Sequence, residues 1–337
     1  MKKRILYIGN QLHKHGFNKT SIETLGVFLA EEGYSVVYTS DKKNQVVRLF
    51  DMMMTTFFKA KKVDYILIDT YSTSSFWYAF FCSQIARFFK TKYIPLLRGG
   101  DLPNRLKNNP YLCKLIFNYS YVNVAPSNYL LEMFKSEGIR NVIFIPNSIE
   151  LKAYQFKERT ILQPKLLWVR AFASIYNPKM AVEVLKLVQE KYPEASLTMV
   201  GPDKDGSLLE TKEFAKSLGL KVNFTGKLSK KEWTDLASEH DIFINTTHFD
   251  NTPVSVMEAM ALGLPVVTTN VGGIPYMLTN QENALLINDG MSAEMVQAIE
   301  SLLEENGLVE RLTSTAKLIV YNMDWQKVKL KWEELLR

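Results

Sequence analysis

The chain has 337 residues, of which 47% are hydrophobic and 23% are charged. These fractions match those of soluble globular proteins and exclude a disordered or fibrous chain. The length is about twice the ~150 residues of a typical domain, so we expect two domains that each bury their own core. Two cysteines, Cys82 and Cys113, are too few for a disulfide framework or a four-cysteine zinc site. Their number favours a reducing, cytoplasmic environment.

The sequence does not favour export or a membrane span. Residues 1–4 carry the positive charge typical of a signal peptide, but the apolar run that follows covers only residues 5–8. The long uncharged stretches at 70–86 and 259–281 are interrupted by polar residues, glycine or proline. Neither resembles the ~20 apolar residues that a membrane-spanning helix needs.

The net charge of +6 is unevenly distributed along the chain. Residues 1–150 carry 20 Lys and Arg against 11 Asp and Glu, and the remainder carries 21 against 24, so the first part is +9 and the second −3. Such asymmetry suits nucleic acid, an anionic membrane surface or a well-solvated face. The basic residues are scattered and no zinc-finger or helix-turn-helix signature accompanies them, so we expect no nucleic-acid partner.

Short apolar runs alternate with amphipathic segments in the first part of the chain. The predicted strands cover residues 5–8, 36–39, 65–68, 93–97, 122–124 and 142–145. The predicted helices cover 21–32, 46–59, 75–89 and a segment that begins near Ser127, a suitable N-cap residue. This alternation predicts a parallel sheet covered by helices on both faces, in a Rossmann-like domain at 1–148.

The same rhythm restarts after a charged, weakly periodic linker at 149–163, and it predicts a second Rossmann-like domain at 164–321. Its predicted strands cover 166–169, 197–200, 222–225, 242–245 and 265–268, and its helices begin near Pro178, Leu208, Ser229, Pro253 and Ser292. We expect residues 322–337 to form a helix that returns to the first domain. The fold class is therefore α/β, with two doubly wound domains that can face each other across a cleft. In such sheets, ligands bind beyond the carboxyl ends of the strands.

One strand-to-helix loop, residues 246–253, has the features of an anion site. Pro253 marks a helix start, where a missing backbone donor costs nothing. The amides of Val254, Ser255 and Val256 are then unpaired at the positive end of the helix dipole, which suits a phosphate or diphosphate.

Two carboxylates bracket this helix start: Asp250 precedes it, and Glu258 lies about one and a half turns into it. Taken alone, Asp250 and Thr252 could cap the helix and Glu258 could be a surface residue. The residues after Glu258 favour a functional role. They read Glu-Ala-Met-Ala at 258–261, Gly-Leu-Pro-Val-Val at 263–267 and Val-Gly-Gly-Ile-Pro at 271–275.

This combination closely resembles the retaining GT-B glycosyltransferases of the glycosyl-transferases group 1 family, whose mark is Glu, seven residues, Glu. The chain departs from the mark by having Asp250 at the first position. The resemblance implies a GT-B fold, an acceptor-binding first domain, a donor-binding second domain, and no metal or cofactor, since the nucleotide-sugar is a substrate. It implies that Glu258 holds the ribose, that Asp250 contacts the sugar, and that Arg170 stabilises the leaving diphosphate.

Further matches extend the resemblance over the donor domain. Residues 167–170 resemble a strand that ends in the diphosphate-binding Arg170, and residues 222–227 resemble the loop beside the nucleotide base. Family members usually carry a lysine five or six residues after the arginine. Here Ile175 and Tyr176 stand at those places, so either Lys179 substitutes or Arg170 and the helix amides act alone. The implied donor-binding residues are Arg170, Lys179, Gly226, Lys227, Asn251, Thr252, Pro253, Val254, Ser255, Glu258, Gly272 and Gly273; the implied catalytic residues are Asp250, Glu258 and Arg170.

The acceptor domain carries weaker matches. Residues 146–149 resemble the family's exit from the first domain, and Gly16 lies where a glycine loop faces the donor. Arg98 stands where relatives often have His, and it either binds an anionic group or ties down its own loop. The acceptor-side candidates are Gly16, Arg98, Gly99, Gly100 and Asp101. We expect the segments 10–20 and 101–110 to be loops that shape specificity.

Other motifs are excluded or discounted. Asp203 and Asp205 imitate an Asp-x-Asp metal motif but lie in a hydrophilic turn, so we predict no metal site. The phosphate-binding glycine motifs of nicotinamide dehydrogenases and P-loop NTPases are missing from the sequence.

The sequence thus predicts a retaining hexosyltransferase that moves a sugar from a nucleotide-sugar to a glycan or lipid-linked acceptor, in cell-surface polysaccharide synthesis. The alternatives are a sugar-nucleotide epimerase of the same fold and a non-catalytic sugar-binding protein. The aromatic helix at 75–89, with nearby cations, is either core or a peripheral contact with the anionic inner face of a membrane.

Overall fold

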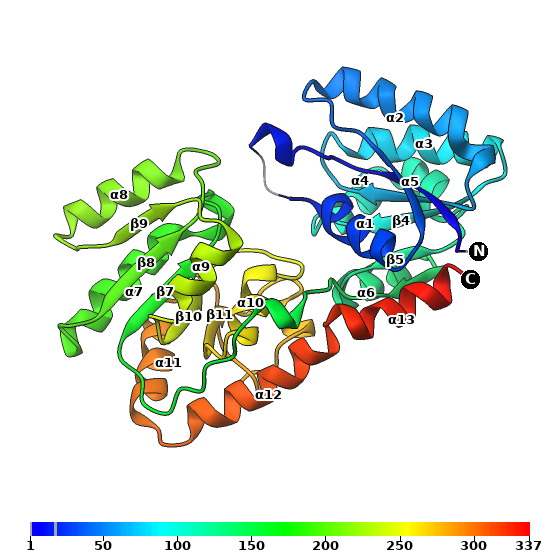
Figure 1. Ribbon diagram of the computed structural model, residues 1–337. Helices are drawn as coiled ribbons and strands as arrows, with labels where there is room; N and C mark the ends of the chain where they lie inside the picture. The colour runs from blue at the N-terminus through cyan, green and yellow to red at the C-terminus, as the bar shows by residue number, and fades with distance from the viewer. Residues whose placement is uncertain (1, 17–18) are drawn as a thin grey trace. The chain divides into compact units, whose positions relative to one another are not determined.

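The computed structural model describes residues 2–16 and 19–337; Phe17 and Asn18, in the segment 10–20 expected to shape specificity, lie outside the described residues. The chain divides into two compact units. Unit 1 comprises Met1–Ser148 and Trp325–Arg337, and unit 2 comprises Ile149–Asp324. Each unit is an α/β structure built on a parallel sheet (Figure 1), as the alternation of apolar runs and amphipathic segments predicts.

Unit 1 contains a six-stranded sheet, within the described residues, in the order β2-β1-β3-β4-β5-β6. Its strands are β1 (Arg4–Ile8), β2 (Ser35–Thr39), β3 (Tyr65–Thr70), β4 (Lys92–Leu97), β5 (Asn123–Ala125) and β6 (Val142–Phe144). Its helices are η1 (His13–His15), α1 (Ser21–Glu31), α2 (Gln45–Lys59), η2 (Ala60–Lys62), α3 (Phe76–Phe88), α4 (Leu102–Asn108), α5 (Pro110–Phe117), α6 (Asn128–Ser136) and α13 (Trp325–Leu335).

The central strands of unit 1 are buried on both faces, which is why they read as continuous apolar runs. In β1, Ile5 and Tyr7 belong to one core cluster, whereas Leu6 and Ile8 belong to another, because successive side chains point to opposite faces. Helix α13 packs into the first of these clusters through residues that include Trp325 and Val328.

Unit 2 contains a second parallel sheet whose described strands follow the order β12-β11-β10-β7-β8-β9. The strands are β7 (Lys165–Val169), β8 (Ser196–Val200), β9 (Asn223–Gly226), β10 (Ile242–Asn245), β11 (Val266–Thr269) and β12 (Leu285–Ile287). The helices are η3 (Leu151–Ala153), η4 (Ser174–Tyr176), α7 (Pro178–Lys191), α8 (Ser207–Ser217), α9 (Lys230–Ala237), α10 (Val254–Ala261), η5 (Ile274–Tyr276), α11 (Ser292–Glu304) and α12 (Leu308–Asn322).

The segment 101–110 was predicted to be a loop, but it contains helix α4, which has Pro103 in its first turn. Proline is tolerated there, where its missing N–H has no helical partner to lose. Leu102, Pro103 and Leu106 are buried on the inner face of this helix, which explains why the segment is ordered.

Among the described residues, no helix has the length and apolar character needed to cross a membrane.

Candidate functional site

The loop between β10 and α10 lies at the carboxyl edge of the unit 2 sheet. Strand β10 pairs with β7 on one side and β11 on the other, and all three run parallel. Residues that follow these strands therefore come together at one edge. Arg170 follows β7, Asp250 lies after β10, and the pair Gly272 and Gly273 lies after β11.

Threonine side chains fix the first part of this loop. Thr246 accepts a hydrogen bond of 3.0 Å from Nε1 of Trp168 and donates to the carbonyl of Tyr176 at 2.9 Å. The hydroxyl of Thr269 donates to the carbonyl of Thr247 at 2.6 Å. These bonds connect the loop to β7, to η4 and to β11, so its backbone is held on three sides before it reaches Asp250.

Arg170 and Asp250 form an ion pair in which both side chains are mostly buried. The guanidinium carbon of Arg170 lies 4.3 Å from the centre of the Tyr176 ring, a cation–π contact. Burial lowers the pKa of Arg170 while Tyr176 opposes this shift, and an arginine remains charged in proteins. Nε of Arg170 is buried and has no hydrogen-bond partner among the described residues.

Gly272 and Gly273 set the position of Asp250. A Cβ on Gly272, where φ is +57°, would lie 2.2 Å from the carbonyl oxygen of Asp250, and one on Gly273 would lie 2.0 Å from that of Asn251. The amide of Gly273 donates to the Asp250 carbonyl at 2.8 Å. The sequence predicts that these glycines let backbone approach a ligand; in the structure, the group they approach is the loop that carries Asp250.

The start of α10 corrects one detail of the prediction. The helix begins at Val254, directly after Pro253. The amide of Val256, however, is not free, since it donates to the carbonyl of Pro253 at 3.1 Å. The amides of Val254 and Ser255 have no backbone partner within the described part of the chain.

Two hydroxyls at the same helix start are buried without a partner among residues 2–16 and 19–337. They are Oγ1 of Thr252 and Oγ of Ser255. Buried polar groups are ordinarily hydrogen-bonded, so such a cluster of donors needs an explanation. Together with the two amides and the nearby Arg170, it has the chemistry of an anion site at a helix N-terminus.

Glu258 is 6% exposed, which contradicts its interpretation as a surface residue. Its Oε1 accepts a hydrogen bond of 2.8 Å from the hydroxyl of Tyr154 and forms an ion pair with Nζ of Lys230. Nζ of Lys230 also donates to the Tyr154 hydroxyl at 2.7 Å. One carboxylate oxygen of Glu258 is thus held by two side chains from outside α10, which fixes the direction of the other.

The remaining donor-side candidates are spread along the same sheet. Lys179, at the start of α7, is paired with Glu210 at 2.8 Å on the exposed side of α8. Gly226 ends β9, and its carbonyl accepts from the amide of Gly201 at 2.9 Å; Lys227 follows it. Gly201 allows β8 to pass close to β7, because a Cβ there would lie 1.7 Å from the carbonyl oxygen of Arg170.

The carboxylates of Asp203 and Asp205 stabilise the turn before α8. Oδ1 of Asp203 accepts from the amides of Gly206 and Leu208. Asp205 accepts hydrogen bonds from both the amide and the hydroxyl of Ser174, and from those of Ser207. Those from the Ser207 hydroxyl and the Ser174 amide lower the pKa of Asp205 to about 2.

In unit 1, Arg98 makes its contacts with other residues of the same unit. Its Nε donates to Oδ1 of the fully buried Asp69 at 3.1 Å, and its Nη1 donates to Oδ1 of Asn147 at 2.9 Å. Burial raises the pKa of Asp69 against the lowering effect of Arg98. Burial lowers the pKa of Arg98, but the neighbouring Tyr7 and Asp69 outweigh this effect, so that the pKa of Arg98 is raised. Of the two interpretations given above, these contacts favour an arginine that ties β3, β4 and the 147 segment together.

The other acceptor-side candidates occupy turns at the carboxyl edge of the unit 1 sheet. Gly16 ends η1 with φ of +86°. Gly99 packs closely on the segment after β3, since a Cβ there would lie 2.9 Å from the amide nitrogen of Ser72. Gly100 follows in the same turn, and Asp101 accepts a hydrogen bond of 2.6 Å from Nδ2 of Asn104 just before α4.

Four residues of this site escape the sequence analysis: Tyr154, Tyr176, Gly201 and Lys230. Tyr154 lies in the predicted linker, 104 positions from Glu258. Tyr176 is noted only as standing where a lysine is expected. A glycine that directly follows a predicted strand, as Gly201 does, is the one local signal that marks a close approach of backbones.

Comparisons with known proteins bear on the family and the fold. The model of the family "Glycosyl transferases group 1" matches residues 154–318. Residues 154–318 therefore belong to this family. Among curated proteins, the sulfoquinovosyl transferase SQD2 of Arabidopsis thaliana is 29% identical over 154 residues, which are 45% of this chain and 29% of the relative. The chain spans less than two thirds of the length of the first curated relatives it matches.

Two solved structures share the fold over nearly the whole chain. Alr3699/HepE of Anabaena, described in complex with UDP and glucose, has a TM-score of 0.80 at 17% identity, covering 99% of each chain. Sucrose-phosphate synthase of Thermosynechococcus elongatus has a TM-score of 0.81 at 14% identity, covering 99% of this chain and 98% of its own. The fold of this chain is therefore GT-B, as the resemblance implies.

Proposed function

We propose that this protein is a retaining glycosyltransferase that moves a hexose from a nucleotide-sugar to a glycan or lipid-linked acceptor. The observation that carries the proposal is the set of unpartnered donors at the start of α10, next to the ion pair of Arg170 and Asp250. The membership of the group 1 family supports it, and the UDP and glucose of the HepE structure supply the donor class to test first.

The donor diphosphate binds at the start of α10 in this proposal. The amides of Val254 and Ser255, the hydroxyl of Thr252 and the guanidinium of Arg170 surround it. The amides and the hydroxyl are preorganised by the fold, so they stabilise negative charge that builds on the departing diphosphate. Arg170 turns from Asp250 toward the diphosphate when the donor binds, and this frees the carboxylate of Asp250 to accept hydrogen bonds from the sugar.

Glu258 accepts hydrogen bonds from the ribose hydroxyls. Tyr154 and Lys230 hold one of its carboxylate oxygens, so the other keeps a fixed direction without further loss of side-chain entropy on binding. Gly226 and Lys227 lie at the end of β9, where we place the base.

The transfer step breaks the bond between the anomeric carbon and the diphosphate oxygen. The acceptor hydroxyl oxygen bonds to the same carbon on the same face, and its proton passes to the departing phosphate oxygen. The products are a nucleoside diphosphate and a glycoside with retained configuration. The reaction needs no metal or cofactor, because Arg170 and the helix amides supply the positive charge. We place the reaction in the cytoplasm, in the synthesis of cell-surface polysaccharide.

A thermal-shift screen of nucleotide-sugars and free nucleoside diphosphates tests the donor site. Binding stabilises the folded state by RT ln(1 + [L]/Kd), so a true donor raises the melting temperature as its concentration rises. Arg170→Ala should abolish the shift given by a nucleoside diphosphate, whereas Lys186→Ala, an exposed substitution on α7, should leave it unchanged. A shift that survives in Arg170→Ala would place the diphosphate elsewhere.

A further inference from the structure

The outward face of helix α2 in unit 1 is apolar although it is exposed to solvent. Met52 and Thr56 are buried on its inward face, as is Arg48, which donates from Nη1 to the carbonyls of Lys42 and Lys43. A surface helix of a globular protein ordinarily presents charged or polar residues to solvent. Here six apolar side chains, each 49–63% exposed, form the outward face: Val46, Val47, Phe50, Met54, Phe57 and Phe58.

This face continues onto the end of α3, which packs beside α2 (Figure 1). The rings of Phe57 and Phe89 meet edge to face with centroids 5.1 Å apart, and Phe89 contacts Phe88 in the same way. Phe88 is 76% exposed. We define the α2 face as residues 46, 47, 50, 54, 57, 58 and 88.

The exposed apolar surface lies mainly on α2, and the aromatic helix predicted at 75–89 contributes Phe88 to it. Most of that helix belongs to the core, since Phe76 and Tyr78 are buried and only Trp77 and Phe88 are among the large exposed side chains there. Residue periodicity alone did not reveal that α2, and not α3, turns its apolar side outward.

Lysines surround the α2 face. Lys42 and Lys43 precede α2, Lys59, Lys61 and Lys62 follow its last apolar residues, and Lys90 follows α3; all six are exposed. The nearby acids already have partners. Asp41 pairs with Lys14 and Lys42, and Asp51 accepts a hydrogen bond from Thr39.

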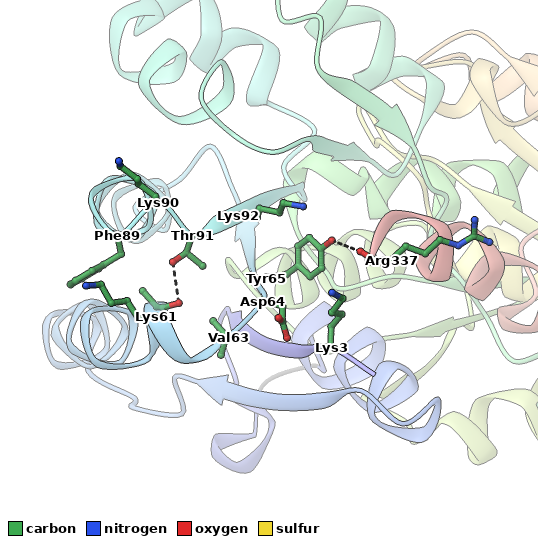
Figure 2. A pocket seen from close by; sticks show the side chains of 11 residues that line it. Lys3, Lys61, Val63, Asp64, Tyr65, Phe89, Lys90, Thr91, Lys92 and Arg337 are labelled. Carbon is green, nitrogen blue, oxygen red and sulfur yellow. Dashed lines mark hydrogen bonds between the residues drawn. The ribbon is translucent and has the colours of Figure 1, made fainter. Parts of the chain in front are cut away.

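A basic hollow of about 480 Å³ borders the same surface. Lys61 and Lys90 line it, as does Phe89, which contacts Phe57 of the α2 face. Figure 2 shows Lys3 and Lys92 on either side of Tyr65 in this hollow. Its charged lining residues are Lys3, Lys61, Asp64, Lys90, Lys92 and Arg337. The carboxylate of Asp64 accepts a hydrogen bond of 2.7 Å from the Arg4 amide. The positive charge of the lining lysines therefore exceeds the negative charge of one carboxylate that already has a partner.

The hollow lies where β1, β3 and β4 begin, at the amino edge of the unit 1 sheet. The acceptor-side candidates Gly16, Arg98 and Asp101 lie at the opposite, carboxyl edge. This surface is therefore separate from the residues assigned to the reaction, and an inference drawn from it does not depend on the proposed function.

We propose that the α2 face and its lysines dock this protein on an anionic phospholipid bilayer. The phenylalanine, valine and methionine side chains enter the interfacial region of the bilayer, and the lysines and the basic hollow contact the phosphates of the headgroups. An anionic bilayer has an apolar layer directly beneath negatively charged headgroups. The apolar side chains of the α2 face match the first, and the surrounding lysines match the second.

Flotation of the full chain with vesicles tests the proposal. Vesicles of phosphatidylcholine alone should bind weakly, and replacing part of the lipid with phosphatidylglycerol should raise the bound fraction at least about tenfold at low salt. Binding should fall as salt is added, because exposed charges are screened. A chain that floats no better with anionic than with neutral vesicles at low ionic strength overturns the proposal.

Two pairs of substitutions locate the contact. Phe50→Ser with Phe58→Ser, and separately Lys61→Glu with Lys62→Glu, should each lower binding to anionic vesicles by about tenfold or more. The matched controls are Leu209→Ser with Leu318→Ser, whose side chains are 62% and 64% exposed in unit 2, and Lys186→Glu with Lys216→Glu. Controls should bind as the unaltered chain does, and all four variants should keep its melting temperature.

Binding that is unchanged in both test variants overturns the proposal. So does a sedimentation experiment in which Phe50→Ser with Phe58→Ser converts a dimer to a monomer while flotation stays the same, since the α2 face would then bind a second copy of the chain. Nucleotide binding in the thermal-shift screen should not change in any of the four variants, so that failure of membrane docking and failure of the donor site are distinguishable.

Discussion

The hydroxyl of Tyr154 donates a hydrogen bond of 2.8 Å to Glu258, across 104 positions of sequence. Tyr154 follows η3 in the segment that leads into β7, whereas Glu258 lies in the middle of α10. The contact therefore attaches helix α10 to the first residues of unit 2, and it directs a carboxylate that we assign to the ribose.

Removing this hydroxyl should weaken donor binding without changing the chemical step. We expect Tyr154→Phe to raise KM for the donor by about three- to tenfold and to change kcat less than about twofold. A hydrogen bond to a charged group contributes about 1.5–3 kcal/mol, and only part of this affects the donor because Lys230 still holds Glu258. The matched control is Tyr192→Phe, which removes a 2.6 Å bond from Tyr192 to the exposed Glu304. Steady-state kinetics with varied donor separate the two effects. An unchanged KM in Tyr154→Phe would show that this contact does not orient Glu258 for binding.

The length of the acid at position 250 should matter less than its charge. We expect Asp250→Ala to lower kcat/KM by about two orders of magnitude, the scale of a lost transition-state contact. Asp250→Glu should keep at least about a tenth of the activity, because it restores the usual family residue and can still pair with Arg170. Initial rates at saturating acceptor measure both. An inactive Asp250→Glu together with an active Asp250→Ala would reverse the assignment.

Gly272 and Gly273, the glycine pair after β11, should be needed for activity because they set the position of Asp250. We expect Gly273→Ala to lower kcat by at least about tenfold, because its Cβ would collide with the Asn251 carbonyl and displace Asp250. Gly219→Ala is the control. Its φ is +70°, so it strains the backbone, but no atom lies within 4 Å of the added carbon. Melting temperatures of both variants show the general cost of the substitution. Full activity in Gly273→Ala would mean that the glycine contact does not set the position of the acid.

Chelation should leave transfer intact. The carboxylates of Asp203 and Asp205 cap a turn and the start of α8. In the proposed donor site, the positive charge comes from Arg170 and helix amides. We expect full activity in EDTA, and less than a twofold change in activity for Asp205→Asn at neutral pH. Rates measured after dialysis against the chelator provide the check. Loss of activity that magnesium or manganese restores would require a metal in the reaction.

The central strands and the loop at 246–253 could be predicted because the sequence patterns that mark them are local. Strands such as β1 and β7 are covered on both faces, so they appear as apolar runs in the sequence. Pro253 likewise marks a helix start to within one residue. Strand β12 was missed because its apolar run, Leu285–Ile287, has three residues, which are too few to show a periodicity.

The contacts that orient the site could not be predicted, because they join residues that are distant in sequence. No local pattern connects Tyr154 with Glu258, or Gly201 with Arg170. The sequence indicated that Gly272 and Gly273 accommodate a close approach, but the approaching group belongs to another loop. The contact of Arg98 with Asp69 could not be predicted either, since the two residues become neighbours only through the pairing of β3 with β4.

Transfer of a labelled sugar tests the central claim most directly. Nucleotide-sugars labelled in the sugar, UDP-glucose among them, are incubated with the full chain and with glycan or lipid-linked acceptors, and the label is followed by chromatography. We predict that label moves to a second molecule while nucleoside diphosphate is released. Arg170→Ala and Glu258→Gln should each lower the rate by about two orders of magnitude while the protein stays folded. Label that stays on the nucleotide in an altered sugar would indicate an epimerase, and label that is only bound would indicate a sugar-binding protein. Either result, or full activity in both variants, would contradict the account.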